Sequence, residues 1–397
     1  MDLPVLTLRP NEEKRLRAGH LWIYSNEVDT DKTPLKTFTP GQQVQVVSSQ
    51  GKNFGVAYVN PNNLICARVL SRSARPFGRG GIENRLEAAL ALREACFDKP
   101  FYRLVYGESD LMPGLVIDRF GDYFVVQISS AGMEALKDQI VGALQRMFNP
   151  KGILLKNDGK MRLAEGLEEY VAVAYGEVPN ELLFEENGVK FRAPVYEGQK
   201  TGWFYDHRLN RARICEYVKG KRVLDVCSYV GGWGVQAAAK GAAHVTCVDV
   251  SDFALREVQA NAALNGVADK VSTIRGDAFE VMEQLLAAKE SFDVVILDPP
   301  AFIPKKKDIA AGTKAYGRMN TLGMKLLGKE GYLLSGSCSM HLAESSLYDL
   351  LRQAGRQLDR HVQIIERGAQ GPDHPVHPAI AETTYIKSLI ARVAMIL

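Results

Sequence analysis

The chain has 397 residues, of which 46% are hydrophobic and 24% are charged. This length exceeds that of one ordinary domain, and the composition supplies enough apolar material for packed cores, which excludes disorder as the main state. The formal net charge is only +3, so any nucleic-acid binding must come from local basic patches and not from bulk charge.

Membrane insertion and secretion are also disfavoured by the sequence. No apolar run reaches the roughly 18 residues that a membrane helix needs, and the N-terminal segment lacks the continuous apolar core of a signal peptide. The six cysteines are scattered without a CxxC pair, which is typical of a reduced protein and not of a disulfide framework or a zinc site. We therefore expect a cytoplasmic enzyme of several domains that does not contact a membrane.

The first 72 residues are rich in short strand patterns. Alternating runs within 38–71 are separated by turn residues, which predicts a small barrel of hairpins. The segment before them mixes basic residues such as Arg15 and Arg17 with the aromatic residues Trp22 and Tyr24. Such a segment can be an exposed helix followed by a strand whose aromatic side chains fill the barrel, or it can be an RNA-binding surface. These residues alone favour the first interpretation.

Residues 73–188 predict a middle domain of helices and strands. A glycine-bearing linker at 71–81 is followed by a helical pattern, and strand patterns then alternate with a second helix over 133–148. We find no catalytic constellation in this part of the chain. A hairpin over 184–196 turns at Asn187 and Gly188, which is a strong two-residue turn signal. It leads into the third predicted domain, residues 189–397.

Strand and helix patterns alternate regularly from about residue 220. Five strand patterns are separated by segments of helix length, so these strands should be parallel and covered on both faces. Two long strand patterns follow, and they fit a seven-stranded sheet with an antiparallel terminal strand. The predicted fold class is therefore α/β, with a doubly wound, Rossmann-like domain whose ligands bind at the carboxyl ends of the strands.

Four successive strand patterns of this domain lead into an aspartate: Asp225, Asp249, Asp277 and Asp298. A lone aspartate there is usually a helix cap or a turn residue, but four in order favour a ligand site. The glycine cluster after the first strand lacks the GxGxxG pattern, which argues against a dinucleotide. The second carboxylate can accept hydrogen bonds from ribose hydroxyls, and the third, beside Ala278, can meet an adenine amino group. A nucleoside cofactor is expected, and S-adenosylmethionine fits best.

The fourth strand continues into a loop with the sequence Asp298-Pro299-Pro300-Ala301-Phe302. Paired prolines stiffen the loop, and Phe302, which we expect to be exposed, can stack on a flat base. Three lysines follow, namely Lys305, Lys306 and Lys307. A lysine run is usually a solvated face, but beside a base pocket it can equally hold the phosphates of RNA.

These motifs, with the segment 199–211 and the run SGSCSMHL, resemble the class I S-adenosylmethionine-dependent RNA methyltransferases. The sequence is most similar to the bacterial 23S ribosomal RNA 5-methylcytosine methyltransferases, the RlmI family, and the resemblance covers the whole chain. It implies a PUA-like RNA-binding domain over 1–72, an α+β middle domain over 73–188 and a methyltransferase domain over 189–397. It also implies S-adenosylmethionine as the cofactor and 23S ribosomal RNA as the partner. The sequence does not reveal whether the chain forms a homodimer.

The resemblance further implies which residues contact the ligands. In the segment before the first strand, the implied cofactor contacts are Lys200, Thr201, Phe204, Tyr205 and Arg208. At the strand ends they are Asp225, Ser228, Tyr229, Gly231, Asp249, Ser251, Asp277, Ala278, Asp298 and Pro299. For RNA we expect contacts from Phe302, Lys305, Lys306, Lys307, Arg15 and Arg17. The residues of 199–211 by themselves fit a lid and an ordinary connecting loop equally well.

The expected reaction requires a cysteine, because carbon 5 of cytosine is a poor nucleophile. A thiolate that adds at carbon 6 makes the ring an enamine, whose carbon 5 can then attack a methyl group. Cys338 follows the fifth strand among serine and glycine neighbours, which are unusual in a core, whereas Cys215 and Cys247 suit a core well. Cys227 also ends a strand but belongs to the expected cofactor loop. We therefore predict Cys338 as the nucleophile and Asp298 as a hydrogen-bonding partner of the target base.

Two alternatives remain open, and the sequence departs from some related enzymes at one position. The chain could methylate a guanine nitrogen of RNA without a thiol, or it could be an inactive RNA-binding protein of ribosome assembly. Ala301 stands where some RNA cytosine-5 enzymes carry a second cysteine, so another group or water must help to release the adduct. His374 and His377 are close in sequence, but no third ligand is evident, so we expect no metal.

Overall fold

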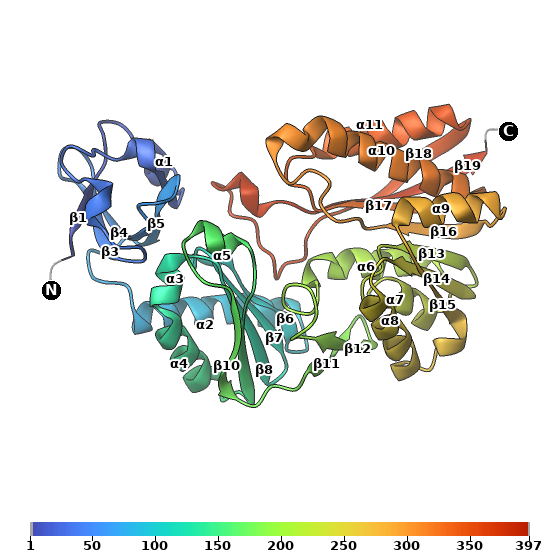
Figure 1. Ribbon diagram of the computed structural model, residues 1–397, viewed down its shortest axis with the longest axis horizontal. Coiled ribbons are helices and arrows are strands. Elements are labelled where there is room, and N and C mark those ends of the chain that lie inside the picture. The colour runs from blue at the N-terminus through green and yellow to red at the C-terminus, as the bar shows by residue number, and fades with distance from the viewer. Residues whose placement is uncertain (1–2, 396–397) are drawn as a thin grey trace. The chain divides into compact units, whose positions relative to one another are not determined.

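The computed structural model describes residues 3–395, which form two compact units (Figure 1). The first unit is the chain up to Phe184 with Ala193–Tyr205 and Pro372–Thr383, and the second is Glu185–Arg192, Asp206–Gly371 and the chain from Thr384 onward. The three domains expected at 1–72, 73–188 and 189–397 stay a prediction beside these units. Among the described residues, no helix is long and apolar enough to cross a membrane.

The first unit begins with a five-stranded sheet of order β1-β3-β4-β5-β2. Its strands are β1 (Val5–Thr7), β2 (Trp22–Tyr24), β3 (Gln43–Val47), β4 (Asn53–Val59) and β5 (Ile65–Ser71), and α1 (Lys14–Arg17) lies between β1 and β2. Alternation places Val44 and Val46 of β3 in the core. A side chain at Gly55 would collide with the carbonyl oxygen of Ser71, so β4 and β5 approach closely only because residue 55 is glycine.

A second five-stranded sheet in the same unit has the order β10-β9-β8-β7-β6. Its strands are β6 (Phe101–Tyr106), β7 (Leu115–Phe120), β8 (Tyr123–Ile128), β9 (Gly152–Asn157) and β10 (Tyr170–Gly176), and its helices are α2 (Arg79–Cys96), α3 (Ala131–Ala135), α4 (Lys137–Phe148) and α5 (Met161–Ala164). The single helix expected over 133–148 is wrong in detail, because the chain leaves helical geometry at Leu136 and forms α3 and α4. The predicted mixture of helices and strands is confirmed.

The expected hairpin is present as β11 (Glu181–Glu186) and β12 (Val189–Pro194). Its two turn residues, Asn187 and Gly188, both have positive φ, at 55° and 77°. Asparagine and glycine tolerate this left-handed geometry best, which is why the two-residue turn could be predicted from the sequence.

The second unit contains a seven-stranded sheet of order β15-β14-β13-β16-β17-β19-β18. The strands are β13 (Arg222–Val226), β14 (His244–Asp249), β15 (Val271–Arg275), β16 (Phe292–Leu297), β17 (Leu327–Ser337), β18 (Arg360–Gly368) and β19 (Lys387–Met395). The first five pair in parallel, whereas β19 is antiparallel to both β17 and β18. This arrangement confirms the predicted α/β fold with an antiparallel terminal strand.

Helices cover both faces of this sheet (Figure 1). They are α6 (Arg208–Ile214), α7 (Gly234–Ala239), α8 (Asp252–Leu264), α9 (Ala278–Ala287), α10 (Ile309–Leu326) and α11 (Glu344–Gln357). Side chains of α9, α10 and α11 share one core with Leu224, Val295 and Leu333 of the sheet. Figure 1 shows α7 and α8 on the opposite face. The carboxyl ends of the parallel strands are therefore left open for ligands.

Candidate functional site

The predicted residues of the second unit gather where β13, β14, β16 and β17 end. In the sheet register, Val226 pairs with Leu297, and Leu297 pairs with Ser335. The end of β17 approaches the Asp298 loop closely, because a Cβ at Gly336 would lie 3.3 Å from Asp298 Oδ1. Parallel strands thus bring residues far apart in the sequence to one edge of the sheet.

Asp225 anchors the glycine-rich loop after β13. Its side chain is fully buried, and Oδ2 accepts a hydrogen bond of 2.8 Å from the Gly234 amide. Burial, together with the nearby negative charges of Asp298 and Asp249, raises the pKa of Asp225 to about 8. The Oδ1 atom is buried without a hydrogen-bond partner. A buried oxygen of this kind is an atom at which a ligand can bind.

The loop itself has an unusual backbone. Cys227, Tyr229 and Gly231 all have positive φ, at 65°, 47° and 86°. Residues other than glycine rarely adopt this conformation, and it is concentrated at ligand-binding sites. The Ser228 hydroxyl is buried without a partner. The loop therefore places left-handed backbone, and the Ser228 hydroxyl without a hydrogen-bond partner, at the carboxyl ends of the strands.

Asp249 lies next to this loop, at the end of β14. One carboxylate oxygen accepts the Tyr229 amide and the other accepts the Ser251 amide, both at 2.9 Å. These two bonds fix the orientation of the carboxylate, and its remaining lone pairs stay available to hydroxyl groups. A half-buried carboxylate held in this way suits a ribose diol.

The neighbouring predicted residues have structural roles as helix caps. Ser251 Oγ accepts the Ala254 amide at 3.2 Å and caps α8. Asp277 Oδ1 accepts the amides of Phe279 and Glu280 and caps α9. Ala278 is buried as the first residue of that helix. Their contacts to a cofactor stay predictions.

Asp298 is held from two sides by residues that the sequence did not single out. Trp233 Nε1 donates to Oδ2 at 2.9 Å, and His207 Nε2 lies 3.4 Å from Oδ1. The amide nitrogen of Asn210 lies 3.0 Å from His207 Nδ1. Because an amide nitrogen can only donate, Nδ1 accepts, and in the neutral ring the proton is on Nε2, facing Asp298. Both residues are within motifs read from the sequence, but no spacing rule indicated their contact with Asp298.

Cys338 is half-buried directly after β17, and its Sγ is 4.0 Å from the Pro299 carbonyl oxygen. The next residue is well fixed, because Ser339 Oγ accepts the Ile303 amide at 3.1 Å and lies 2.9 Å from Tyr316 Oη. By contrast, the Cys247 thiol is fully buried, and burial raises its pKa well above the ordinary value. A partly exposed thiol at a strand end is better placed for reaction than a deeply buried one.

The predicted cofactor contacts before β13 are divided between the two units. Lys200, Thr201, Phe204 and Tyr205 belong to the first unit, and Arg208 belongs to the second. Within the first unit the Thr201 hydroxyl bonds to Asp118 at 2.5 Å, Tyr205 Oη donates to the Arg119 carbonyl, and Lys200 Nζ lies 4.8 Å from the Phe204 ring centre. In the second unit Arg208 is buried beside Glu186. The expected cofactor contacts of these residues stay predictions.

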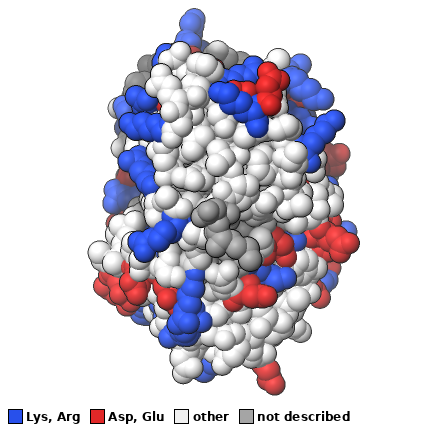
Figure 2. Space-filling view, turned by 90° about the vertical axis from the view of Figure 1, so that its left-hand side faces the viewer, with Lys and Arg blue, Asp and Glu red and all other residues white. Residues whose placement is uncertain are grey.

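The predicted RNA contacts differ in exposure. Phe302 was expected to be exposed, but it is half-buried, because its ring packs 4.8 Å from that of Tyr316. Lysines 305–307 are exposed. Arg15 pairs with Glu27 at 2.8 Å, and Arg17 pairs with Glu13 at 3.0 Å. On the side shown in Figure 2, Lys and Arg side chains gather mainly on the upper part, and Asp and Glu mainly on the lower part.

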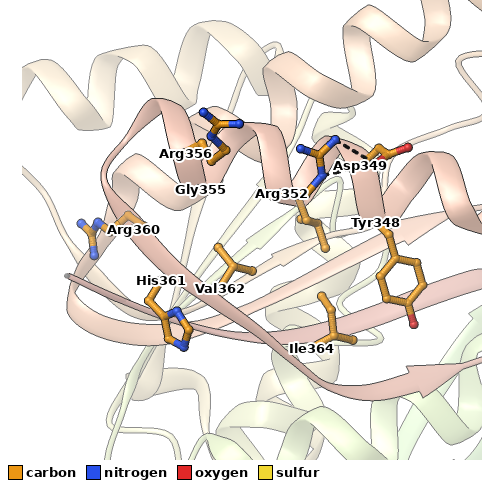
Figure 3. A pocket seen from close by; sticks show the side chains of 10 residues that line it. Tyr348, Asp349, Arg352, Gly355, Arg356, Arg360, His361, Val362 and Ile364 are labelled. Atoms are coloured by element: carbon orange, nitrogen blue, oxygen red, sulfur yellow. Dashed lines mark hydrogen bonds and ion pairs between the residues drawn. The ribbon is translucent and has the colours of Figure 1, made fainter.

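A cavity of about 380 Å³ lies elsewhere in the second unit, between α11 and β18 (Figure 3). Arg352, Arg356 and Arg360 line it, but Arg352 pairs with Asp349, and Arg360 donates to carbonyl groups at the start of β17. The strand-end aspartates and Cys338 do not line this cavity. It is therefore distinct from the candidate site.

Comparison with known proteins identifies the family. The model of the S-adenosylmethionine-dependent methyltransferases matches residues 171–392, and that of the PUA-like domain matches residues 6–72. Ribosomal RNA large subunit methyltransferase I of Aliivibrio fischeri is 36% identical over 392 residues, which cover 97% of this chain and 98% of that enzyme. The enzyme of the same name from Vibrio cholerae is 35% identical over 397 residues, covering 98% and 99%. The chain belongs to the ribosomal RNA large subunit methyltransferase I family.

Solved structures agree with the fold expected of this family. A SAM-dependent methyltransferase from Streptococcus mutans is 21% identical, with a TM-score of 0.82 over 98% of this chain and all of that chain. A methyltransferase complexed with SAH has a TM-score of 0.83, also at 21% identity and with the same coverage. Because the sequence identity is only 21%, the structural similarity to these two proteins shows the fold alone. The family assignment makes S-adenosylmethionine the cofactor and confirms the predicted PUA-like and methyltransferase domains.

Proposed function

We propose that this methyltransferase acts on carbon 5 of a cytosine in 23S ribosomal RNA of the large subunit, and that Cys338 forms a covalent adduct with carbon 6. The observation that carries the proposal is the partly exposed Cys338 thiol beside the Asp298 loop. The names of the curated relatives support large-subunit ribosomal RNA as the substrate. The PUA-like domain supports a role for the first unit in binding RNA.

The strand-end residues suit the cofactor. S-adenosylmethionine is a nucleoside with an amino-acid side chain and needs polar protein atoms to bind it. Such atoms are present in the loop at 227–231 with its positive φ angles, in the oriented carboxylate of Asp249 and at Asp225 Oδ1, which has no hydrogen-bond partner. When bound, S-adenosylmethionine supplies a methyl group on a positively charged sulfur. Asp249 would hold the ribose hydroxyls, and the loop would lie against the rest of the molecule.

In the proposed reaction the Cys338 thiolate forms an S–C6 bond, and the electron pair of the C5–C6 double bond moves to carbon 5. Carbon 5 would then form a bond to the methyl carbon as the bond from that carbon to the sulfonium sulfur breaks, and S-adenosylhomocysteine would leave. The C5 proton next passes to water, its electron pair restores the double bond, and the S–C6 bond breaks to release the thiolate. Water is the proposed acceptor because Ala301, which follows the paired prolines, carries no proton-accepting group.

Asp298 would bind the amino edge of the cytosine and favour protonation of the ring nitrogen. Trp233 donates a hydrogen bond to one oxygen of its carboxylate and His207 Nε2 lies 3.4 Å from the other, so Asp298 is oriented before the base arrives. Preorganised groups lower a barrier because they need no reorientation during the reaction. A guanine-nitrogen methyltransferase could use the same aspartate, but Cys338 would then have no role.

Mass spectrometry of ribosomal RNA nucleosides tests this proposal. Ribosomal RNA from cells with and without the protein is digested, and methylated nucleosides are quantified. We expect the 5-methylcytidine of large-subunit RNA to fall in cells that lack the protein and to return when the wild-type chain is restored. Unchanged 5-methylcytidine with the loss of a methylguanosine would contradict the cytosine assignment and support the guanine alternative.

The cofactor site gives a separate prediction at Asp249. An Asp249→Ala variant should bind S-adenosylhomocysteine about tenfold more weakly or worse, because the ribose loses a charged acceptor and two loop amides lose theirs. Isothermal titration calorimetry measures the change. An Asp252→Ala variant is a matched control, since that nearby carboxylate pairs with Arg256 on the surface of α8. Equal affinities of the two variants would contradict the assigned role of Asp249.

A further inference from the structure

Lys387 is a buried lysine next to the proposed nucleophile. It is the first residue of β19 and lies opposite Ser337 in the antiparallel ladder. The residue is only 9% exposed, and its Nζ donates a hydrogen bond of 2.6 Å to the carbonyl oxygen of Ser339. The ammonium group is therefore held at the strand end that carries Cys338.

This burial is costly for a charged group. Removing an ammonium from water is unfavourable unless it finds hydrogen bonds or an opposite charge. Burial lowers the pKa of Lys387, whereas Cys338 and Glu344 act in the opposite direction and raise it. No ion pair joins Lys387 to a carboxylate within the described residues. Besides the exposed carboxylate of Glu344, the group near Lys387 that can become an anion is the Cys338 thiol.

Tyr316 and Glu344 are titratable groups near this pair, and Asp298 belongs to the loop that contacts the thiol, but none of the three supplies a positive charge. Tyr316 bonds to Ser339 Oγ, and burial raises its pKa, so its hydroxyl stays neutral. Glu344, exposed at the start of α11, is negative and favours the ammonium form of Lys387. Among these groups, only Lys387 carries the charge that stabilises a thiolate.

We propose that Lys387 is a positioning residue that holds Cys338 as a thiolate ready to attack carbon 6. This inference rests on the proposed function and adds a second residue to it. The thiol proton is released to solvent, Lys387 remains an ammonium throughout, and no bond to lysine forms. The antiparallel strand β19 would thus take part in the chemistry, because its pairing with β17 fixes the distance between ammonium and sulfur.

Alkylation of Cys338 by iodoacetamide, followed by peptide mass spectrometry across pH, tests the proposal on the full-length protein. In the wild type we expect the pKa of Cys338 to lie below the ordinary thiol value of about 8.5. In Lys387→Met it should rise by about one unit, which slows alkylation near pH 7 about tenfold. Lys387→Arg keeps the charge and should retain most of the wild-type rate.

Cys247 of the same unit serves as an internal control for folding, because its thiol is fully buried and should react slowly in any folded variant. The proposal is overturned if the wild-type pKa of Cys338 is not below the ordinary value, whether or not Lys387→Met folds. It is also overturned if folded Lys387→Met has the wild-type pKa. Neither result depends on RNA or cofactor, so failure of the cytosine assignment is detected separately by the nucleoside assay.

Discussion

Replacing Cys338 by alanine is expected to reduce RNA methylation by roughly 10³-fold or more, because a covalent mechanism has no route without its nucleophile. The thiol is at the end of β17, outside the hydrophobic core, so the variant should fold. It should also bind S-adenosylhomocysteine with wild-type affinity, because the strand-end aspartates are unchanged. Transfer of a labelled methyl group to ribosomal RNA, measured in single turnover, gives the rate.

A matched control is Cys96→Ala, which removes an exposed thiol from the end of α2 in the first unit and should leave the rate unchanged. Cofactor calorimetry on Cys338→Ala separates lost chemistry from lost binding. If Cys338→Ala retained the wild-type rate, the covalent mechanism would be wrong, and the guanine-nitrogen alternative would become the better account.

The second large effect is expected at Asp298. An Asp298→Asn variant keeps the shape of the side chain but loses the negative charge, and its amide nitrogen cannot accept a hydrogen bond. We expect the methylation rate to fall about 10²-fold, because the target base loses a preorganised charged partner. The same change removes the acceptor that faces His207 or the one that faces Trp233.

An Asp277→Asn variant is a first comparison, since Asp277 is exposed and caps α9 through one oxygen. Because Asp277 is also a predicted cofactor contact, the cleaner control is Asp349→Asn, which changes an exposed carboxylate paired with Arg352 on α11 and should leave the methylation rate nearly unchanged. The ratio of the effects on kcat and KM is informative, because a group that acts mainly in the transition state lowers kcat more than it raises KM. An unchanged kcat in Asp298→Asn would contradict the role proposed for this carboxylate.

Most of the fold could be predicted because its signals are local. Asn187 and Gly188 specify a two-residue turn, Ser251 marks the start of α8, and the alternation of strand and helix patterns after residue 220 predicts parallel pairing. The break at Leu136 was missed, since a continuous helical pattern does not reveal where tertiary contacts interrupt a helix.

The candidate site was only partly predictable for a related reason. Strand-end aspartates follow from topology, but the contact of His207 with Asp298 joins positions 91 residues apart and leaves no spacing pattern. The position of Lys387 could not be predicted for the same reason. Lys387 is the first residue of β19, and only the pairing of β19 with β17 brings it to the strand end that carries Cys338. Phe302 was expected to be exposed, and only the packing of Tyr316 against its ring shows why it is half-buried.

The division into units also depends on contacts that sequence patterns do not contain. A boundary near residue 188 follows from the hairpin, yet Ala193–Tyr205 and Pro372–Thr383 belong to the first unit. The buried Asp118 carboxylate, which pairs with Arg103, receives the Thr201 hydroxyl, and the buried Arg93 donates to the Asp373 carbonyl. Such long-range polar contacts decide which segment belongs to which unit.

The central claim is that Cys338 bonds to carbon 6 of the target cytosine, and trapping this adduct tests it most directly. Ribosomal RNA that contains 5-fluorocytosine is incubated with the full-length enzyme and S-adenosylmethionine, and the protein is digested for peptide mass spectrometry. Fluorine cannot leave carbon 5 as a proton does, so the adduct should accumulate on the peptide that contains Cys338 and be absent from Cys338→Ala. Normal methylation of unmodified RNA with no adduct at Cys338 would contradict the account.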